Sequence, residues 1–268
     1  MARVNSAEVA SRSLKEYGYA HLSPELLDPS RSGCTARQVE EFVGSWDALP
    51  CDSYTLTSGS GTRRRRYGRC AVLEEGIKVL PPTPFVQSDE VNPIFGGIER
   101  QFAALDTAFG ASPVLSSLIR MLCQCIPPLP DPMACLDLGI HQIRVQASAG
   151  AAGLPTPEGI HQDGHRYVAQ VFITRNGVDG GRSTFYENGV AVYQTYLTQP
   201  FECLLVDDRR MHHGVSAITP AGTTAAGWRD MLLLDFPEPA PVEALAGAGA
   251  GADERAAWAL LPEAAPGG

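Results

Sequence analysis

Hydrophobic residues in the first part of the chain recur at the spacing of amphipathic helices. Residues 7–16 begin after Ser6, a common helix N-cap, and stop before Gly18, a common C-cap. Thr35 and Gln38 then match the pattern of a capping box. The apolar residues after this box fall on one helix face: Val39, Phe42, Val43 and Trp46. The pattern predicts one helix after each N-cap.

The helical spacing returns over residues 97–126. Ile98, Phe102 and Leu105 lie on one stripe, which predicts a first helix in this range. Ser112-Pro113 is typical of a helix start and predicts a second helix. The residues of this second helix that we expect to face inward are Leu115, Leu118, Ile119 and Leu122.

After Pro127-Pro128 the pattern changes to that of short strands. Residues 139–147 alternate between two kinds of side chain, as in a strand with two different faces. Further short apolar runs, separated by Gly, Asp or Pro, cover residues 167–174, 202–206, 213–218 and 228–236. Residues 51–84 also indicate strands or loops. Several strands without intervening helices predict an antiparallel sandwich or jelly roll rather than alternating strands and helices.

Together these patterns predict a mainly β protein with flanking helices, of the α+β class. We expect a single domain over residues 1–236. Its N-terminal part, to about residue 130, is helical, and its jelly-roll core starts at about residue 131. Residues 237–268 are rich in Ala, Gly, Pro and Glu, a composition that predicts a flexible tail.

Composition and charge narrow the possible partners. Hydrophobic residues make up 44% of the 268, which is enough for a core. The net charge of -9 argues against a nucleic-acid partner, and we interpret the short basic run 63–66 as a solvated patch. We find no apolar leader and no run near the roughly 18 apolar residues of a membrane span. The odd count of seven cysteines favours reduced thiols, so we expect a cytoplasmic protein.

The residues that point most clearly to chemistry are His161 and Asp163. Residues two apart on a strand project from the same face, so an imidazole and a carboxylate can converge on one ion. A second histidine follows several strands later, as His212 or His213. Two histidines and one carboxylate leave three coordination positions open, which suits Fe(II) with a bidentate co-substrate and O₂. Zinc also accepts this ligand set, so the ligands alone do not fix the metal.

Three segments resemble one enzyme family. Residues 160–164 (Ile-His-Gln-Asp-Gly), 207–218 and 228–232 are similar to the bacterial 2-oxoglutarate/Fe(II) dioxygenases related to L-isoleucine 4-hydroxylase. The resemblance extends more weakly to residues 65–68 and 92–100. It implies a double-stranded β-helix core, also described as a cupin-like jelly roll, and hydroxylation of a free amino acid at an unactivated carbon. The implied cofactors are Fe(II), 2-oxoglutarate and O₂, and the implied by-products are succinate and CO₂.

The resemblance also implies roles for individual residues. His161 and Asp163 match the first two iron ligands of the family. The family's His-Gly-Val-Thr-Pro-Ile pattern aligns with the segment that starts at His213, which favours His213 over His212 as the third ligand, although Ser216-Ala217 departs from it. Arg229 matches the arginine that binds the far carboxylate of 2-oxoglutarate, and a guanidinium suits that task because it donates two parallel hydrogen bonds.

Four other residues are candidates for substrate binding. Gln142 and Arg144 share one face of the predicted strand 139–147. If that face lines the pocket, Arg144 binds a substrate carboxylate; if it faces solvent, neither residue has such a role. Tyr167 and Gln170 follow the ligand pair closely and can donate hydrogen bonds to substrate or co-substrate.

Two alternative functions remain open from the residues. A cupin-like hydrolase or isomerase uses the same metal ligands without 2-oxoglutarate, and such an enzyme has no need of Arg229. A non-catalytic jelly roll that senses a ligand is disfavoured, because the chain is acidic and contains no DNA-reading element.

Overall fold

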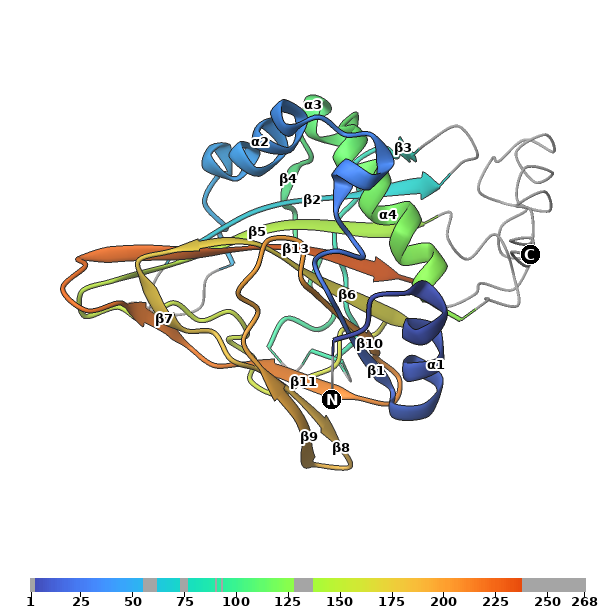
Figure 1. Cartoon of the computed structure of the whole chain (residues 1–268). Coiled ribbons are helices and arrows are strands. Elements are labelled where there is room, and N and C mark those ends of the chain that lie inside the picture. Colours follow the sequence, from blue (N-terminus) through green and yellow to red (C-terminus); the bar gives the residue numbers. More distant parts are fainter. Residues whose placement is uncertain are drawn as a thin grey trace, which may run out of the picture.

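A large β-sheet organises the protein (Figure 1). The computed structural model describes residues 3–54, 62–72, 77–89, 91–92, 94–127 and 137–237. The strands of the large sheet are β1 (Tyr19–Leu22), β2 (Arg63–Val72), β3 (Ile77–Val79), β4 (Ala103–Ala104), β5 (Leu138–Ser148), β6 (Tyr167–Asn176), β10 (Cys203–Asp207) and β13 (Ala226–Phe236). Their order is β1-β10-β6-β13-β5-β2-β3, all antiparallel, and β4 pairs in parallel with β2.

Shorter strands form a second layer, below the large sheet in Figure 1. They are β7 (Val178–Gly180), β8 (Ser183–Glu187), β9 (Val190–Thr195), β11 (His212–Val215) and β12 (Ile218–Pro220). β11, β8 and β9 make one small sheet, and β12 and β7 make another. A pocket lies between the layers, because its lining residues come from β2, β5, β6 and β13 on one side and from β11 on the other. This two-layer arrangement is the predicted jelly roll.

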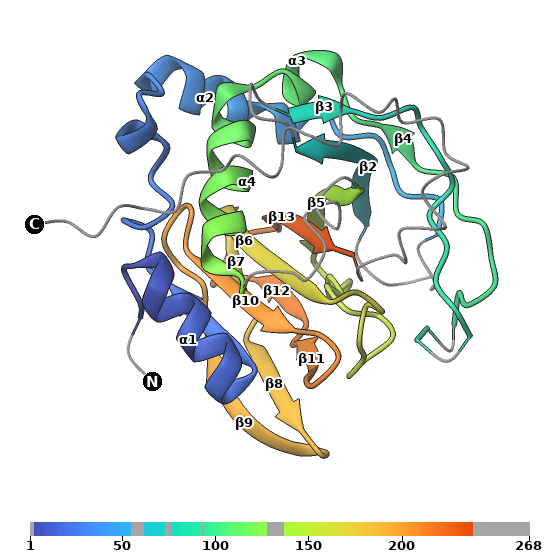
Figure 2. The ribbon, with the colours of Figure 1, turned by 90° about the vertical axis from the view of Figure 1, so that its right-hand side faces the viewer.

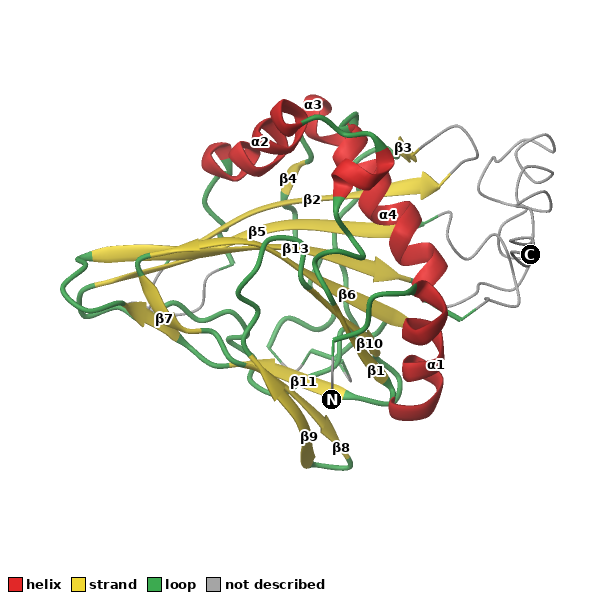
Figure 3. Cartoon of the chain, viewed as in Figure 1, coloured by secondary structure: helices red, strands yellow, loops and turns green. Residues whose placement is uncertain are grey.

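Helices cover the face of the large sheet that is turned away from the short strands (Figures 2 and 3). They are α1 (Ala7–Tyr17), η1 (Pro29–Ser32), α2 (Ala36–Gly44), η2 (Ser45–Ala48), α3 (Thr107–Gly110) and α4 (Pro113–Cys125). The main core lies between the sheet and these helices, and it includes Trp46, Leu118 and Leu122. The predicted caps are confirmed: Ser6 accepts from the Val9 N–H, and Thr35 begins a capping box.

Side chains alternate along β13 between two environments. Leu232, Leu234 and Phe236 are buried in the core against the helices. The odd-numbered residues from Arg229 to Asp235 line the pocket on the other face. Because successive residues of a strand point to opposite faces, one strand both packs the core and supplies the site.

The predicted helix that includes Ile98, Phe102 and Leu105 is wrong. β4 lies inside this range and pairs with Arg66 and Tyr67 of β2, which is incompatible with helical backbone hydrogen bonding. The ring of Phe102 packs against the aromatic residues Tyr54, Tyr67 and Phe85. The apolar residues of this segment therefore have a helix-like spacing although the backbone is irregular, because aromatic packing requires them.

The mainly β class and the strands predicted from the second half of the chain are confirmed. Residues 213–218 divide into β11 and β12, and β1, β7 and β9 lie outside the predicted strands. The single domain over residues 1–236 stays a prediction. The predicted flexible tail lies, from residue 238 on, outside the described residues. Over the part of the chain that the structure describes, no helix is long and apolar enough to cross a membrane.

Candidate metal centre

Backbone pairing brings two histidines together. His161 and His213 form an isolated antiparallel bridge, in which each backbone N–H donates to the carbonyl of the other residue at 2.9 and 2.8 Å. Their rings lie on the same side, with centroids 4.4 Å apart. His213 is buried, whereas the neighbouring His212 is exposed on the other face of β11. The structure therefore brings His213, and not His212, to His161.

Asp163 reaches the histidines from a loop. Its backbone N–H donates to the carboxylate of Asp208 at 2.9 Å, and the N–H groups of Gly164 and His165 donate to the same carboxylate at 2.7 and 3.2 Å. Asp208 is only 1% exposed, so water does not compete for these bonds. The side chains of residues 161 and 163 converge, as predicted. They do not share a strand, however, because Asp163 lies in a loop. Sequence analysis missed Asp208.

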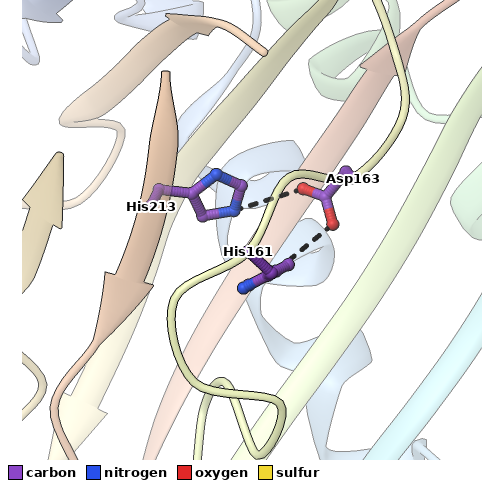
Figure 4. Close-up of side chains that lie close together, drawn as sticks. All are labelled: His161, Asp163 and His213. Carbon is purple, nitrogen blue, oxygen red and sulfur yellow. Dashed lines mark ion pairs between the residues drawn. The ribbon is translucent and has the colours of Figure 1, made fainter. Parts of the chain in front are cut away.

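The three side chains converge on one point (Figure 4). Nε2 of His161 lies 3.5 Å from Oδ1 of Asp163, and Nε2 of His213 lies 3.3 Å from Oδ2. One ligand atom from each residue lies within 4.8 Å of the other two. Nδ1 of His161 is 3.1 Å from the Gly159 carbonyl oxygen, and a donor at Nδ1 leaves Nε2 free for an ion. The donor set and its spacing fit a divalent transition metal with open coordination positions.

Charge is concentrated at this point. Burial lowers the pKa of His161, but its hydrogen bond to Asp163 and the negative charges of Asp163 and Glu158 outweigh that effect and raise the pKa to about 9. Burial would raise the pKa of Asp163, but the charge of His213 and the hydrogen bonds of both imidazoles hold it well below its usual range. A proton on the His161 imidazole therefore compensates the charge of the buried Asp163 carboxylate.

Arg229 lines the same pocket and is 2% exposed. Its Nε and Nη2 atoms are buried, and they form no hydrogen bond within the described residues. Burial lowers the pKa of this guanidinium to about 10. Gly181 packs against its side chain, where an added Cβ would lie 3.1 Å from the Arg229 Cδ. A buried cation with unused donors is suited to bind the carboxylate of a small molecule.

The structure does not bring Gln142 and Arg144 to the pocket, which was the condition for their predicted role in substrate binding. Both residues lie on the face of β5 that is turned toward the helices, and neither lines the pocket. Arg144 donates two hydrogen bonds of 2.7 Å to the buried Asp230 carboxylate and pairs with Asp47. The Gln142 amide donates to the Ser45 hydroxyl at 3.0 Å. Both residues therefore attach the η2 side of the helical layer to the sheet.

The other two candidates for substrate binding, Tyr167 and Gln170, lie on different sides of the sheet. Tyr167 is buried in the core between the sheet and the helices, so it does not lie where the prediction requires. Gln170 is buried in the pocket wall, where the prediction expects it, and its contact with substrate stays a prediction. Alternation along β6 separates the two, since Tyr167 and Gln170 are three residues apart and therefore point to opposite faces of the strand.

The pocket wall also contains polar residues to which the sequence assigned no role. Arg65, His141 and Asp235 line it together with Arg100. The basic run 63–66 is therefore not a solvated patch, because Arg63 and Arg65 are buried and point into the pocket. In the structure Arg63 and Arg65 are buried while Arg64 and Arg66 are half-buried, but four identical residues contain no sequence pattern that could show this.

We predict that the affinity of the site for a divalent metal falls as the pH is lowered. A proton must leave His161 before its Nε2 can bind an ion, and the pKa of about 9 means that this proton is present at neutral pH. Below that pKa the apparent affinity should fall by about tenfold per pH unit for each proton released. Calorimetric titration with Mn(II) between about pH 6 and about pH 8 measures this apparent affinity. An affinity that does not change over this range would contradict the protonation state assigned to the site.

Comparison with known proteins agrees with this geometry. A family model described as 2OG-Fe dioxygenase matches residues 44–235. The 3(1)-hydroxy-L-isoleucine 4-dioxygenase of Pantoea ananatis (strain AJ13355) is 25% identical over 237 residues, which cover 83% of this chain and 93% of the relative. The L-isoleucine-4-hydroxylase of Bacillus thuringiensis is 25% identical over 158 residues, which cover 57% of this chain and 64% of the relative.

Solved structures have the same fold. A bsmA homolog from Methylobium petroleophilum PM1 aligns with a TM-score of 0.72 and 25% identity, over 90% of this chain and 97% of that one. The structure of IDO from Bacillus thuringiensis aligns with a TM-score of 0.69 and 20% identity, over 90% and 98% of the two chains. Since the family model also spans most of the chain, the protein belongs to the 2OG-Fe dioxygenase family, whose members use Fe(II), 2-oxoglutarate and O₂.

Proposed function

We propose that this dioxygenase hydroxylates a free aliphatic amino acid at an unactivated carbon. The observation that carries the proposal is the buried, unpaired Arg229 in the same pocket as the His161, Asp163 and His213 cluster. A metal hydrolase or isomerase with the same ligands has no use for a second charged anchor of this kind. Together the cluster and the arginine provide the two attachments that 2-oxoglutarate needs, one at the metal and one at its far carboxylate.

Each residue has a distinct task in this proposal. His161, Asp163 and His213 would hold Fe(II) from one side and leave its other positions for 2-oxoglutarate and O₂. The metal supplies the oxidative decarboxylation of 2-oxoglutarate to succinate and CO₂, coupled to insertion of one oxygen atom into a substrate C–H bond. Arg229 binds and orients the far carboxylate, and the apolar wall beside it excludes water. The protein's contribution is therefore geometry and shielding.

Two observations support an aliphatic amino acid as the substrate. The pocket contains apolar side chains that suit an aliphatic body, among them Phe95, Ile143, Val145 and Val215. Both curated relatives carry names that refer to L-isoleucine or its hydroxylated form. The proposed partner is thus a small molecule rather than a nucleic acid, in keeping with the net charge of -9. A cytoplasmic location is part of the proposal, and the free thiols among the described cysteines support it.

A direct assay tests this function. The purified protein is incubated with Fe(II), 2-oxoglutarate, ascorbate and each of the free amino acids in turn. We expect one or more aliphatic amino acids to gain one oxygen atom by mass spectrometry, with one succinate formed for each product molecule. If succinate forms and no amino acid is oxidised, the chain is a dioxygenase for another class of substrate.

Adjacent histidines provide the matched control for this assay. His213→Ala should abolish product formation and Fe(II) binding, since it removes one of the three converging ligands. His212→Ala changes the neighbouring residue on the exposed face of β11 and should keep most of the activity. The opposite ranking of the two variants would contradict the ligand assignment.

A second prediction concerns the anchor for 2-oxoglutarate. Arg229→Ala would leave the far carboxylate buried without a charged partner, a loss of about 3–5 kcal/mol, or roughly a hundredfold to a few thousandfold in affinity. Arg229→Lys should recover part of the loss, because it restores the charge without the two-pronged geometry. Arg182→Ala, at an exposed arginine nearby, is the control. Anaerobic calorimetry measures 2-oxoglutarate binding, and wild-type affinity in Arg229→Ala would place the anchor elsewhere.

A further inference from the structure

Two more arginines in the pocket form no ion pair with a carboxylate among the described residues. Arg65 is 7% exposed and Arg100 is 3% exposed, and both line the pocket that contains the metal ligands. The Nε atom of each is buried without a hydrogen-bond acceptor within the described residues. Their neighbour Arg63 differs, because its Nε lies 2.6 Å from the Asp52 carboxylate. The cations of Arg65 and Arg100 are therefore not needed to pair with an internal acid.

Arg65 is held rigidly in place. Its guanidinium stacks on Phe102, 4.1 Å from the ring centroid, and lies 5.3 Å from that of Phe85. It also donates to Nδ1 of His141, whose Nε2 lies 2.6 Å from Asp235. The Asp235 carboxylate thus reaches Arg65 only through an imidazole. Burial, together with the charge of Arg63, lowers the pKa of Arg65 to about 9, as expected for a cation that lacks a direct counterion.

Arg100 is connected to the metal loop. Its guanidinium lies 4.8 Å from the ring centroid of Phe85 and 5.0 Å from that of Phe95. It donates to the side-chain oxygen of Gln87, and the Gln87 amide donates to the backbone carbonyl of Asp163 at 3.0 Å. A ligand held by Arg100 is therefore fixed relative to the loop that carries a metal ligand.

Sheet register separates these arginines from the co-substrate anchor. Arg229 on β13 pairs with Val145 on β5, whereas Arg65 on β2 pairs with Ile143 of the same β5 strand. Arg65 and Arg229 thus lie two strands apart, a separation of roughly 10 Å at the usual strand spacing. The two side chains therefore start from different strands and different rows of the sheet. The pocket thus offers buried cations from two strands, and 2-oxoglutarate at Arg229 would leave Arg65 and Arg100 without an assigned anion.

We propose that Arg65 and Arg100 bind the carboxylate of the primary substrate. Both guanidinium groups lie near the same two rings, Phe85 and Phe102, so they share one part of the pocket, where a single carboxylate can accept from both. The apolar side chains of Ile143 and Phe95 then contact the body of the substrate. The substrate class is a small carboxylic acid, which excludes the corresponding amides and amines. This inference rests on the proposed function, since it takes Arg229 to be occupied by 2-oxoglutarate.

The first test needs no variant. The wild-type protein is titrated anaerobically by calorimetry, with Fe(II), in the presence and absence of 2-oxoglutarate. The probes are the aliphatic free amino acids, their carboxamides, and 3-methylpentanoate, which keeps the carboxylate of isoleucine and lacks its amino group. Because loss of the charged partner of a buried arginine weakens binding steeply, the amides should bind on the order of a hundredfold more weakly than the acids. Equal binding of acids and amides, or no binding of any acid, overturns the proposal.

The second test assigns the binding to these residues. Arg65→Gln and Arg100→Gln should each weaken binding of the acids on the order of a hundredfold, and Arg65→Gln should leave the Fe(II) and 2-oxoglutarate affinities unchanged. Arg66→Gln is the matched control, because the Arg66 guanidinium donates to the Ala104 carbonyl and does not line the pocket. If one variant does not fold, the other and the wild-type comparison still decide. Wild-type affinity for the acids in both folded variants overturns the proposal.

The same titrations separate this inference from the proposed function. If wild-type protein fails to bind 2-oxoglutarate, the proposed function fails, and the titrations without 2-oxoglutarate still show whether acids bind in preference to amides. If 2-oxoglutarate binds and the acids show no dependence on Arg65 or Arg100, only the carboxylate site is wrong.

Discussion

The two backbone hydrogen bonds between His161 and His213 are the contact on which the site depends. They attach an otherwise irregular segment to β11 and place both imidazoles on the same side of the bridge. The loop then continues to Asp163, whose backbone is fixed by the buried Asp208 carboxylate. Three ligands from two distant parts of the sequence converge because backbone groups, and not only side chains, determine their positions. Ligands held in this way need little reorganisation when an ion binds.

The charge distribution of the pocket follows from the same architecture. The large sheet uses one face for the helical core and the other for the pocket, so buried arginines on β2 and β13 have no solvent and few acids around them. Burying a cation without a partner is unfavourable, and such groups commonly mark functional sites. Arg229 and Arg65 lie in different strands and different rows of the sheet. This arrangement suits the proposal that the pocket binds two anionic molecules.

Much of the fold and of the metal centre was predictable from local sequence patterns. The sequence around Ser6 and Thr35 is typical of helix caps, and the later strands are short apolar runs. These local patterns predicted the observed elements because tertiary contacts did not override them. The convergence of His161, Asp163 and His213 was also anticipated, partly through the resemblance to a known family. The aromatic residues around Phe102, in contrast, imitated a helical stripe, because their spacing reflects packing against distant rings.

Face assignment was the step that sequence could not resolve. β5 is buried on both sides, one against helices and one against the pocket, so burial does not reveal which side chains reach the substrate. The sequence placed Gln142 and Arg144 on one face of this strand but left open whether that face lines the pocket, and the buried Arg65 was hidden in a run of four arginines. Only the register between β2, β5 and β13 distinguishes these possibilities.

The most direct test of the account is a crystal structure of the protein prepared without O₂ and with Fe(II) and 2-oxoglutarate. It should show the iron bonded to Nε2 of His161, Nε2 of His213 and the Asp163 carboxylate, with the far carboxylate of 2-oxoglutarate on Arg229. The guanidinium groups of Arg65 and Arg100 should remain accessible from the pocket for a second molecule. Iron bound to other residues, or 2-oxoglutarate attached to Arg65 instead of Arg229, would contradict the account.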